Sequence, residues 1–164
     1  MKNILVTGGA GFIGSAFVRR MVSKHPEYTI VVFDKMTYAG NTDNLLPVSQ
    51  SGNFRLVQCD IADREAVRSA FDSYGIDTVV NFAAETHVDR SILSPDAFIY
   101  SNVVGVHILL ESAQKHGIER FLHVSTDEVY GDIEGDHFSV EDDPFKPNSP
   151  YAASKAGGDL MVRA

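Results

Sequence analysis

Short apolar runs, rich in β-branched residues, alternate along this chain with longer segments of helical periodicity. The runs predict strands near residues 2–6, 29–34, 54–58, 77–81 and 119–124. The other segments predict helices near residues 11–24, 63–73, 95–116 and from 149 onward. This alternation is typical of βαβ units, whose parallel strands are covered by helices on both faces. We therefore expect an α/β fold with a doubly wound parallel sheet.

The bulk composition is that of an ordinary globular domain. The chain has 164 residues, 44% of them hydrophobic and 22% charged, which suits one domain with a real core. A net charge of -8 argues against a nucleic-acid partner, which would select a basic face. No apolar run approaches the roughly 20 residues that cross a bilayer, so no membrane association is expected. Cys59 is the only cysteine, and we expect a cytoplasmic protein.

Three glycines follow the first predicted strand and open the first predicted helix. Gly8, Gly11 and Gly14 have the spacing G-x-x-G-x-x-G. Glycines in this context allow a tight turn and let a helix N-terminus face a pyrophosphate. The pattern predicts a dinucleotide site.

The end of the second predicted strand bears on which dinucleotide binds. Asp34 stands 20 residues after Gly14, where a carboxylate accepts hydrogen bonds from the ribose hydroxyls and repels a 2′-phosphate. This favours NAD over NADP. The neighbouring Lys35 weakens the argument, because a cation there would tolerate the extra phosphate.

Candidate catalytic groups cluster in the last third of the sequence. Thr126, Asp127 and Glu128 follow the last predicted strand, and Tyr151 and Lys155 stand four apart at the start of a predicted helix. Residues four apart share one helix face. A tyrosine has a pKa of about 10, and a nearby ammonium and a positive nicotinamide ring are both expected to lower it. Tyr151 would then act as a base toward a substrate hydroxyl.

Two long connections, residues 83–95 and 125–147, follow strand carboxyl ends, where open α/β sheets bind ligands. The second carries six acidic residues whose spacing favours a solvated flap over a metal site: Asp132, Glu134, Asp136, Glu141, Asp142 and Asp143. The predicted helix 95–116 is apolar on nearly all sides, which calls for a second packing partner.

Two motifs identify a known superfamily. Residues 7–14, TGGAGFIG, together with residues 151–155, YAASK, resemble the extended short-chain dehydrogenases/reductases of the NAD-dependent epimerase/dehydratase type. Within that superfamily, residues 34–41, 83–91 and 125–131 resemble the dTDP-glucose 4,6-dehydratase family. The resemblance covers essentially the whole chain, and the Thr-Asp-Glu triplet is its most specific part.

The resemblance implies a role for each candidate residue. Tyr151 would take the proton of the sugar C4 hydroxyl while a hydride passes to NAD, and Lys155 would hold the nicotinamide ribose. Glu128 would remove the C5 proton and Asp127 would protonate the departing C6 hydroxyl. Thr126 would bind the sugar near O4, and His87 would lie near the substrate. The product would be dTDP-4-keto-6-deoxyglucose, made by a lyase of deoxysugar biosynthesis.

The resemblance also implies a Rossmann-type domain over residues 1–164 and a homodimer formed through helices 95–116 and 149–164. Members of the family are about twice as long, so we expect a chain that is truncated before the nucleotide-sugar lobe and that by itself need not be active. Further cofactor contacts are expected, beyond the three glycines and the Tyr151/Lys155 pair, from Phe12, Ile13, Asp34, Lys35, Thr37, Asp60, Ile61, Ala83, Ala84 and Ser101.

Two other functions remain open on the sequence. A 4-epimerase or a UDP-glucuronate decarboxylase would keep Tyr151, Lys155 and NAD, but neither has a use for both Asp127 and Glu128. A non-catalytic dinucleotide-binding module is the second alternative, because the chain is expected to lack the nucleotide-sugar lobe. The identity of the nucleotide rests on the resemblance alone.

Overall fold

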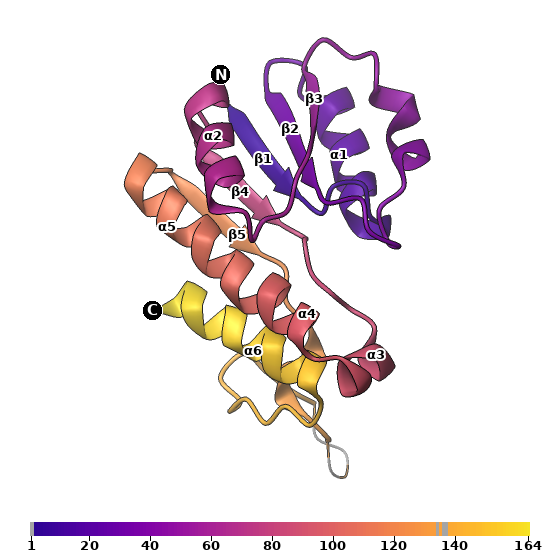
Figure 1. Ribbon diagram of the computed structural model, residues 1–164, viewed down its shortest axis with the longest axis vertical. Coiled ribbons are helices and arrows are strands. Elements are labelled where there is room, and N and C mark those ends of the chain that lie inside the picture. The colour runs from indigo at the N-terminus through magenta and orange to yellow at the C-terminus, as the bar shows by residue number, and fades with distance from the viewer. Residues whose placement is uncertain (1, 134, 136–137) are drawn as a thin grey trace. The chain divides into compact units, whose positions relative to one another are not determined.

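The computed structural model describes residues 2–133, 135 and 138–164 (Figure 1), so Glu134 and Asp136 of the acidic connection lie outside the described residues. The chain forms two compact units. The first, called the sheet unit, comprises Met1–Ala83 and Ile108–Val124; the second, the helical unit, comprises Ala84–His107 and Ser125–Ala164. Within the described ranges, every helix is too short or too polar to cross a bilayer.

The sheet unit contains five parallel strands in the order β3-β2-β1-β4-β5. The strands are β1 (Asn3–Thr7), β2 (Thr29–Asp34), β3 (Phe54–Gln58), β4 (Thr78–Asn81) and β5 (Arg120–His123). Each lies within one residue of its predicted bounds. The strand order reverses beside β1, because β2 and β4 are both its neighbours. A doubly wound α/β sheet of the Rossmann type, as predicted, is confirmed.

Apolar side chains of the central strands β1, β2 and β4 are buried on both faces of this sheet, which is why these strands read as continuous apolar runs. Helix α1 (Phe12–Lys24) and the short 3₁₀ helix η1 (Thr42–Val48) bury their apolar side against one face. Helix α2 (Arg64–Tyr74) lies on the other side of the sheet from α1 (Figure 1). The connection through α1 leads from β1 to β2, and the connection through α2 leads in the opposite direction across the sheet, from β3 to β4. Because both crossovers are right-handed, the two helices lie on opposite faces of the sheet.

The helical unit contains the C-terminal helix and the first part of a long helix, up to His107; residues 108–116 of the long helix belong to the sheet unit. The predicted helix 95–116 is present as α4 (Asp96–Ile99), a π-helical segment η2 (Tyr100–Gly105) and α5 (Val106–His116). Helix α6 (Pro150–Arg163) starts at the cap Ser149, whose hydroxyl accepts from the Ala152 amide at 3.0 Å. Helices of this unit pack on one another within Ala84–His107 and Ser125–Ala164.

Both long connections contain short helices that the sequence did not predict. Helix α3 (Val88–Leu93) lies in the first connection, and the 3₁₀ helix η3 (Asp127–Tyr130) lies in the second. Helices of four to six residues are unstable in isolation, so local periodicity gives little warning of them. The Thr126 cap stabilises η3, and packing against α6 stabilises α3.

Candidate active site

The glycine loop is closed too tightly for side chains at two of its positions. Gly8 has a φ of +66°, and a Cβ there would stand 2.6 Å from the amide nitrogen of Ala83. A Cβ on Gly14 would stand 2.3 Å from the carbonyl oxygen of Gly8. The amide of Gly11 donates to that same carbonyl at 3.2 Å. The three glycines therefore form a compact turn at the N-terminus of α1, which suits close approach of a pyrophosphate.

Asp34 is fixed at the end of β2 beside this loop. Its Oδ2 accepts from the amide of Ala10 at 2.9 Å, and its Oδ1 accepts from the amide of Met36 at 2.9 Å. The side chain belongs to the buried polar set, with 9% of the residue exposed. A carboxylate is thus held against the glycine loop, as the ribose-binding prediction requires.

The other predicted cofactor residues are divided between the two units. Phe12 and Ile13 open α1 with 90% and 63% of their surfaces exposed, leaving them available to a ligand. The sheet unit also holds Lys35, Thr37, Asp60, Ile61 and Ala83, and the helical unit holds Ala84, Ser101, Tyr151 and Lys155. The structure thus brings together the glycines, Asp34 and their neighbours in the sheet unit.

A buried polar chain at the carboxyl ends of β1, β4 and β5 was not predicted. The Thr7 hydroxyl donates to Asn81 Oδ1, and Asn81 Nδ2 lies 2.8 Å from His123 Nδ1. The amide of Ala83 donates to the Thr7 hydroxyl at 3.4 Å. These bonds tie three strand ends to the backbone that faces Gly8. A polar residue at the end of each apolar run was the available sequence signal.

The candidate triplet of Thr126, Asp127 and Glu128 lies at the start of η3. Thr126 caps this turn, and its Oγ1 accepts from the amide of Glu128 at 3.3 Å. Thr126 also hydrogen-bonds the phenol of Tyr151. The predicted catalytic residues Thr126, Asp127, Glu128 and Tyr151 therefore lie together in the helical unit.

Burial and neighbouring groups act on the pKa of Tyr151 in opposite directions. Burial raises the pKa of Tyr151 above its ordinary value of 10.0, the hydrogen bond from Thr126 lowers it, and the charges of Glu128 and Asp127 raise it. The prediction that Lys155 lowers the Tyr151 pKa stays a prediction; burial and the charges of Glu128 and Asp127 act in the opposite direction. Desolvation and two nearby carboxylates favour the neutral phenol.

Lys155 is itself strongly affected by burial. Only 3% of the residue is exposed, and burial lowers the pKa of its ammonium while the charge of Asp159 raises it. Asp159 also accepts a hydrogen bond from the Ser125 hydroxyl. Lys155 therefore lies in the protein interior, on the same face of α6 as Tyr151.

Three buried polar residues that position α6 were missed from the sequence. Asn102, on the π-helical segment, accepts from the Glu85 amide at 2.9 Å and donates to the Glu85 carbonyl at 3.0 Å. Its Nδ2 also lies 2.9 Å from the Ser154 hydroxyl, which in turn donates to the Tyr151 carbonyl at 2.7 Å. Asn102 is a polar residue in an otherwise apolar helix, and that was the signal available.

The third missed residue, Ser91 of α3, accepts a hydrogen bond from the amide of Tyr151 at 3.1 Å. His87, predicted to lie near the substrate, is exposed and stands at the N-cap of this same helix. The structure therefore places His87 on an element that is hydrogen-bonded to the start of α6.

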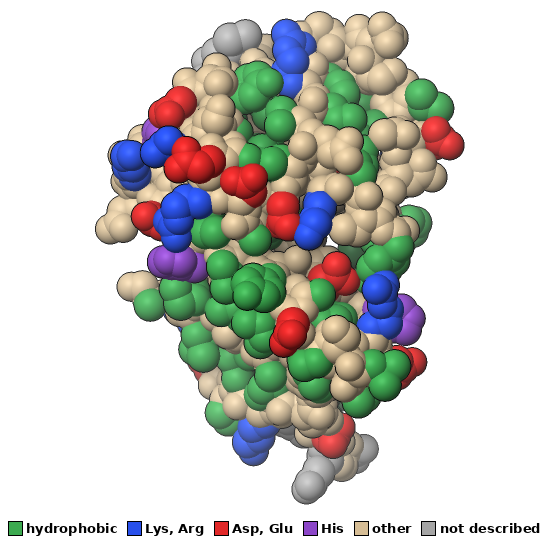
Figure 2. Space-filling model, viewed as in Figure 1, with side chains coloured by type: hydrophobic (Ala, Val, Ile, Leu, Met, Phe, Trp, Pro, Cys, Tyr) green, Lys and Arg blue, Asp and Glu red, His purple; other side chains and the backbone are tan. Residues whose placement is uncertain are grey.

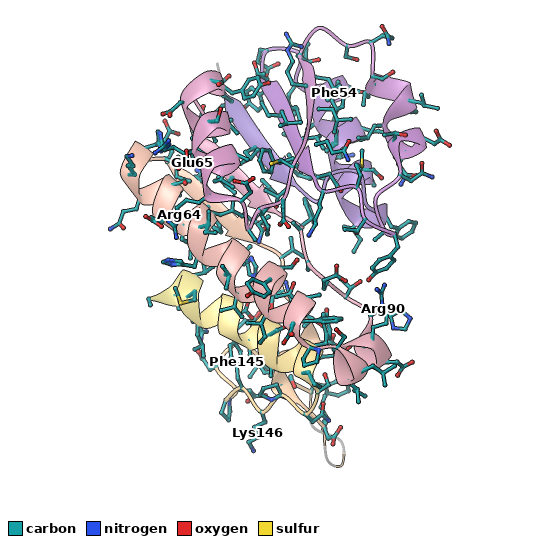
Figure 3. The ribbon with its side chains drawn as sticks, in the orientation of Figure 1. Phe54, Arg64, Glu65, Arg90, Phe145 and Lys146 are labelled. Carbon is teal, nitrogen blue, oxygen red and sulfur yellow. The ribbon has the colours of Figure 1, made fainter. Side chains whose placement is uncertain are left out.

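The connection after η3 folds back beneath α6. The Lys146 amide donates to the Val129 carbonyl at 2.9 Å, and the Phe145 ring packs edge-on against Tyr130. The Arg163 guanidinium lies 5.4 Å from the centre of the Phe145 ring, and Phe145 and Lys146 are labelled on this loop in Figure 3. A cavity of about 510 Å³ is lined by Tyr130, Asp132, Ile133, Ser139, Asp143, Pro144, Lys146 and Asn148.

Known proteins resemble this chain throughout its length. A dTDP-glucose 4,6-dehydratase of Mycobacterium tuberculosis is 47% identical over 163 residues, which are 98% of this chain and 48% of that protein. The crystal structure of the dTDP-glucose 4,6-dehydratase DesIV from Streptomyces venezuelae, solved with NAD bound, gives a TM-score of 0.92 at 48% identity. That match covers 98% of this chain and 50% of DesIV. The chain thus spans about half the length of the relatives it matches.

A UDP-Glc/GlcNAc 4-epimerase from Campylobacter jejuni has nearly the same fold, with a TM-score of 0.91, but only 28% identity; the match covers 99% of this chain and 48% of that one. Backbone similarity alone does not separate the two activities. The model of the GDP-mannose 4,6 dehydratase family matches residues 5–164, a range that includes the glycine loop, the candidate triplet and Tyr151. By that match, the chain belongs to the GDP-mannose 4,6 dehydratase family.

Proposed function

We propose that this chain provides the cofactor-binding and acid–base half of a nucleotide-sugar 4,6-dehydratase that acts on dTDP-glucose. The observation that carries the proposal is the contact of the Thr126 cap with Tyr151, with Asp127 and Glu128 close enough to shift the Tyr151 pKa. An acid, a base and a phenol in one place suit water elimination next to an oxidised carbon.

The proposed cofactor is NAD. The glycine turn leaves no room for a Cβ at Gly8 or Gly14. Asp34 is held beside this turn, where its carboxylate can accept hydrogen bonds from the ribose hydroxyls. Both features fit the adenosine side of a dinucleotide. When bound, NAD would accept a hydride from sugar C4 and later return it to C6.

The side chains of this chain would handle the protons. Tyr151 accepts the proton of the C4 hydroxyl, while Thr126 hydrogen-bonds near O4. The 4-ketone acidifies C5, Glu128 takes the C5 proton, and Asp127 protonates the C6 hydroxyl as it leaves as water. Glu128 then returns a proton to C5. The product is a 4-keto-6-deoxy sugar, and the reaction has no net redox change.

We further propose that the active enzyme includes a nucleotide-sugar lobe from sequence beyond these 164 residues, because this chain covers only about half the length of each relative. Residues 1–164 would then be its NAD-binding domain. A cytoplasmic location agrees with the single cysteine, Cys59.

A homodimer through the long helix and α6 is part of the same proposal. Ile99 and Tyr100 are 47% and 62% exposed, and Leu160 and Met161 of α6 are 56% and 37% exposed. Figure 2 shows hydrophobic side chains gathered over this helical region of the visible face. Apolar patches of this kind mark association surfaces.

The test is product analysis with a chain of the relatives' full length, given NAD and dTDP-glucose. We expect a product lighter by one water that absorbs in alkali as a 4-keto sugar. Glu128→Gln should still oxidise C4 and accumulate reduced nicotinamide while product formation stops. Glu141→Gln, on the exposed connection, is the matched control and should turn over normally.

Other products would identify the alternatives. A C4 epimer without water loss would indicate an epimerase, and loss of CO₂ from a UDP-glucuronate substrate would indicate a decarboxylase. Dinucleotide binding without turnover of any nucleotide sugar would indicate a binding module. Full dehydratase turnover by Glu128→Gln would show that the assigned base is wrong.

A further inference from the structure

The residue after Asp34 is a cation whose role the sequence leaves open. A lysine beside the ribose-binding carboxylate is placed to accept a 2′-phosphate and so to admit NADP. Strand pairing decides what lies next to it. β2 and β3 are parallel with Asp34 opposite Gln58, and the Cys59 amide donates to the Asp34 carbonyl at 2.9 Å. The residues just past β3 therefore lie beside Lys35.

Asp60 is the partner that this register brings to Lys35. Lys35 Nζ lies 2.6 Å from Asp60 Oδ2. The other oxygen, Asp60 Oδ1, accepts from the amide of Ala62 at 2.9 Å. The carboxylate is thus anchored to its own backbone, with its side chain 28% exposed, while the Lys35 side chain is 59% exposed. The rigid partner of this pair is Asp60, and the flexible lysine is drawn to it.

Asp34 has no such freedom. Two backbone amides fix its two oxygens, so its negative charge stays beside the glycine turn whichever dinucleotide arrives. Taken together, the three side chains leave one unbalanced negative charge at this end of the sheet when all are ionised.

We propose that Asp60 is a specificity-determining residue for the dinucleotide, because its ion pair withholds the Lys35 ammonium from a 2′-phosphate. The inference rests on the proposed function, in which this site binds NAD. With Asp60 present, a 2′-phosphate meets Asp34 and a lysine that must first leave its carboxylate. Without that carboxylate, Lys35 balances Asp34 and is available to the phosphate.

The substitution Asp60→Asn tests this with little change of shape. The asparagine Oδ1 keeps the acceptor for the Ala62 amide, while the charge that holds Lys35 is removed. Any contact of Asp60 with a part common to NAD and NADP changes both affinities alike. The ratio of the two dissociation constants therefore reports on the 2′-phosphate alone.

The experiment is calorimetric titration of NAD and of NADP into the wild-type protein, Asp60→Asn, Lys35→Met and the double variant. We expect Asp60→Asn to lower the Kd ratio of NADP to NAD by about fivefold, the scale of one half-exposed ion pair. In the Lys35→Met background the same substitution should leave the ratio unchanged. Asp72→Asn, on the distant C-terminal turn of α2, controls for net charge and should not alter the ratio.

Three results would overturn the inference in different ways. An unchanged ratio in Asp60→Asn shows that Asp60 has no part in selectivity. An equal change with and without Lys35 shows that Asp60 repels the phosphate directly, without acting through the lysine. If the wild-type protein binds neither dinucleotide, the proposed cofactor itself fails, and that failure is seen before any variant is compared.

Discussion

The amide of Tyr151 donates a hydrogen bond to the hydroxyl of Ser91, 60 positions earlier in the chain, at 3.1 Å. The first amides of a helix have no partner within the helix, and here a side chain of α3 satisfies one of them. The Ser91 hydroxyl donates in turn to the Val88 carbonyl at 2.6 Å. Both residues are buried, so water does not replace this bond easily. The start of α6, with its candidate base, is therefore attached to α3.

Ser91→Ala should destabilise the protein, because it leaves the buried amide of Tyr151 without its acceptor. The expected loss is about 1–3 kcal/mol in the free energy of unfolding, measured by urea denaturation. Ser69→Ala, at an exposed position of α2, is the control and should change stability little. Equal stability of the two variants would show that the hydroxyl contributes nothing.

The pKa of Tyr151 should respond to its two neighbours in opposite directions. Glu128→Gln removes a negative charge and should lower the Tyr151 pKa, whereas Thr126→Val removes the hydrogen bond and should raise it. Titration of the tyrosine Cζ resonances by NMR measures both changes. Thr126→Ser keeps the hydroxyl and should leave the titration in place; shifts of the same sign in both variants would contradict this assignment.

Gly14→Ala should weaken dinucleotide binding, because the new Cβ would meet the Gly8 carbonyl oxygen at 2.3 Å and displace the glycine turn. The comparison variant is Gly52→Ala, where a Cβ has open space. Titration with NAD should then show at least a tenfold weaker affinity for Gly14→Ala, a loss of about 1.4 kcal/mol or more, and none for Gly52→Ala. Wild-type affinity in Gly14→Ala would mean that the turn does not hold the cofactor.

The ion pair of His116 with Asp72 should make stability depend on pH. His116 Nε2 lies 2.9 Å from Asp72 Oδ1; the bond to Asp72 raises the pKa of His116, and the bond to His116 lowers that of Asp72. The raised pKa of His116 stabilises the fold fully at pH values below the ordinary histidine pKa. This stabilisation is lost as the pH rises through the raised pKa. The lowered pKa of Asp72 stabilises the fold fully at pH values above the ordinary aspartate pKa. This stabilisation is lost as the pH falls through the lowered pKa. Together they act fully between about pH 4 and pH 6.5.

Urea unfolding of the wild-type protein and Asp72→Asn at a series of pH values measures this dependence. The difference in unfolding free energy should be largest near pH 6 and shrink toward pH 9. The exposed pair of Glu65 and Arg68, 2.6 Å apart, contains no histidine, so Glu65→Gln is the control and should show a constant difference. A difference for Asp72→Asn that grows toward pH 9 would refute the assignment.

Periodicity was enough to predict the five strands and the main helices, since their apolar patterns record burial on both faces of a parallel sheet. It missed α3, η3 and η1, which are too short to carry a pattern and depend on caps such as Thr126 and Asn41. The candidate catalytic residues could be named from their spacing and from the resemblance. Ser91, Asn102 and Ser154 could not, because nothing local distinguishes a serine or asparagine that bonds a distant backbone.

Charge was predicted least well. The sequence places Lys155 four residues from Tyr151, where it is predicted to lower the Tyr151 pKa, and Lys35 next to Asp34, where it is predicted to tolerate a 2′-phosphate. The tertiary structure adds what spacing does not give, because burial and carboxylates from another segment raise the Tyr151 pKa, and strand register pairs Lys35 with Asp60. Sequence alone determined the strands, the main helices and the inventory of reactive groups, since these follow from local spacing. Protonation and pairing depend on desolvation and on neighbours distant in the chain, which only the folded structure brings together.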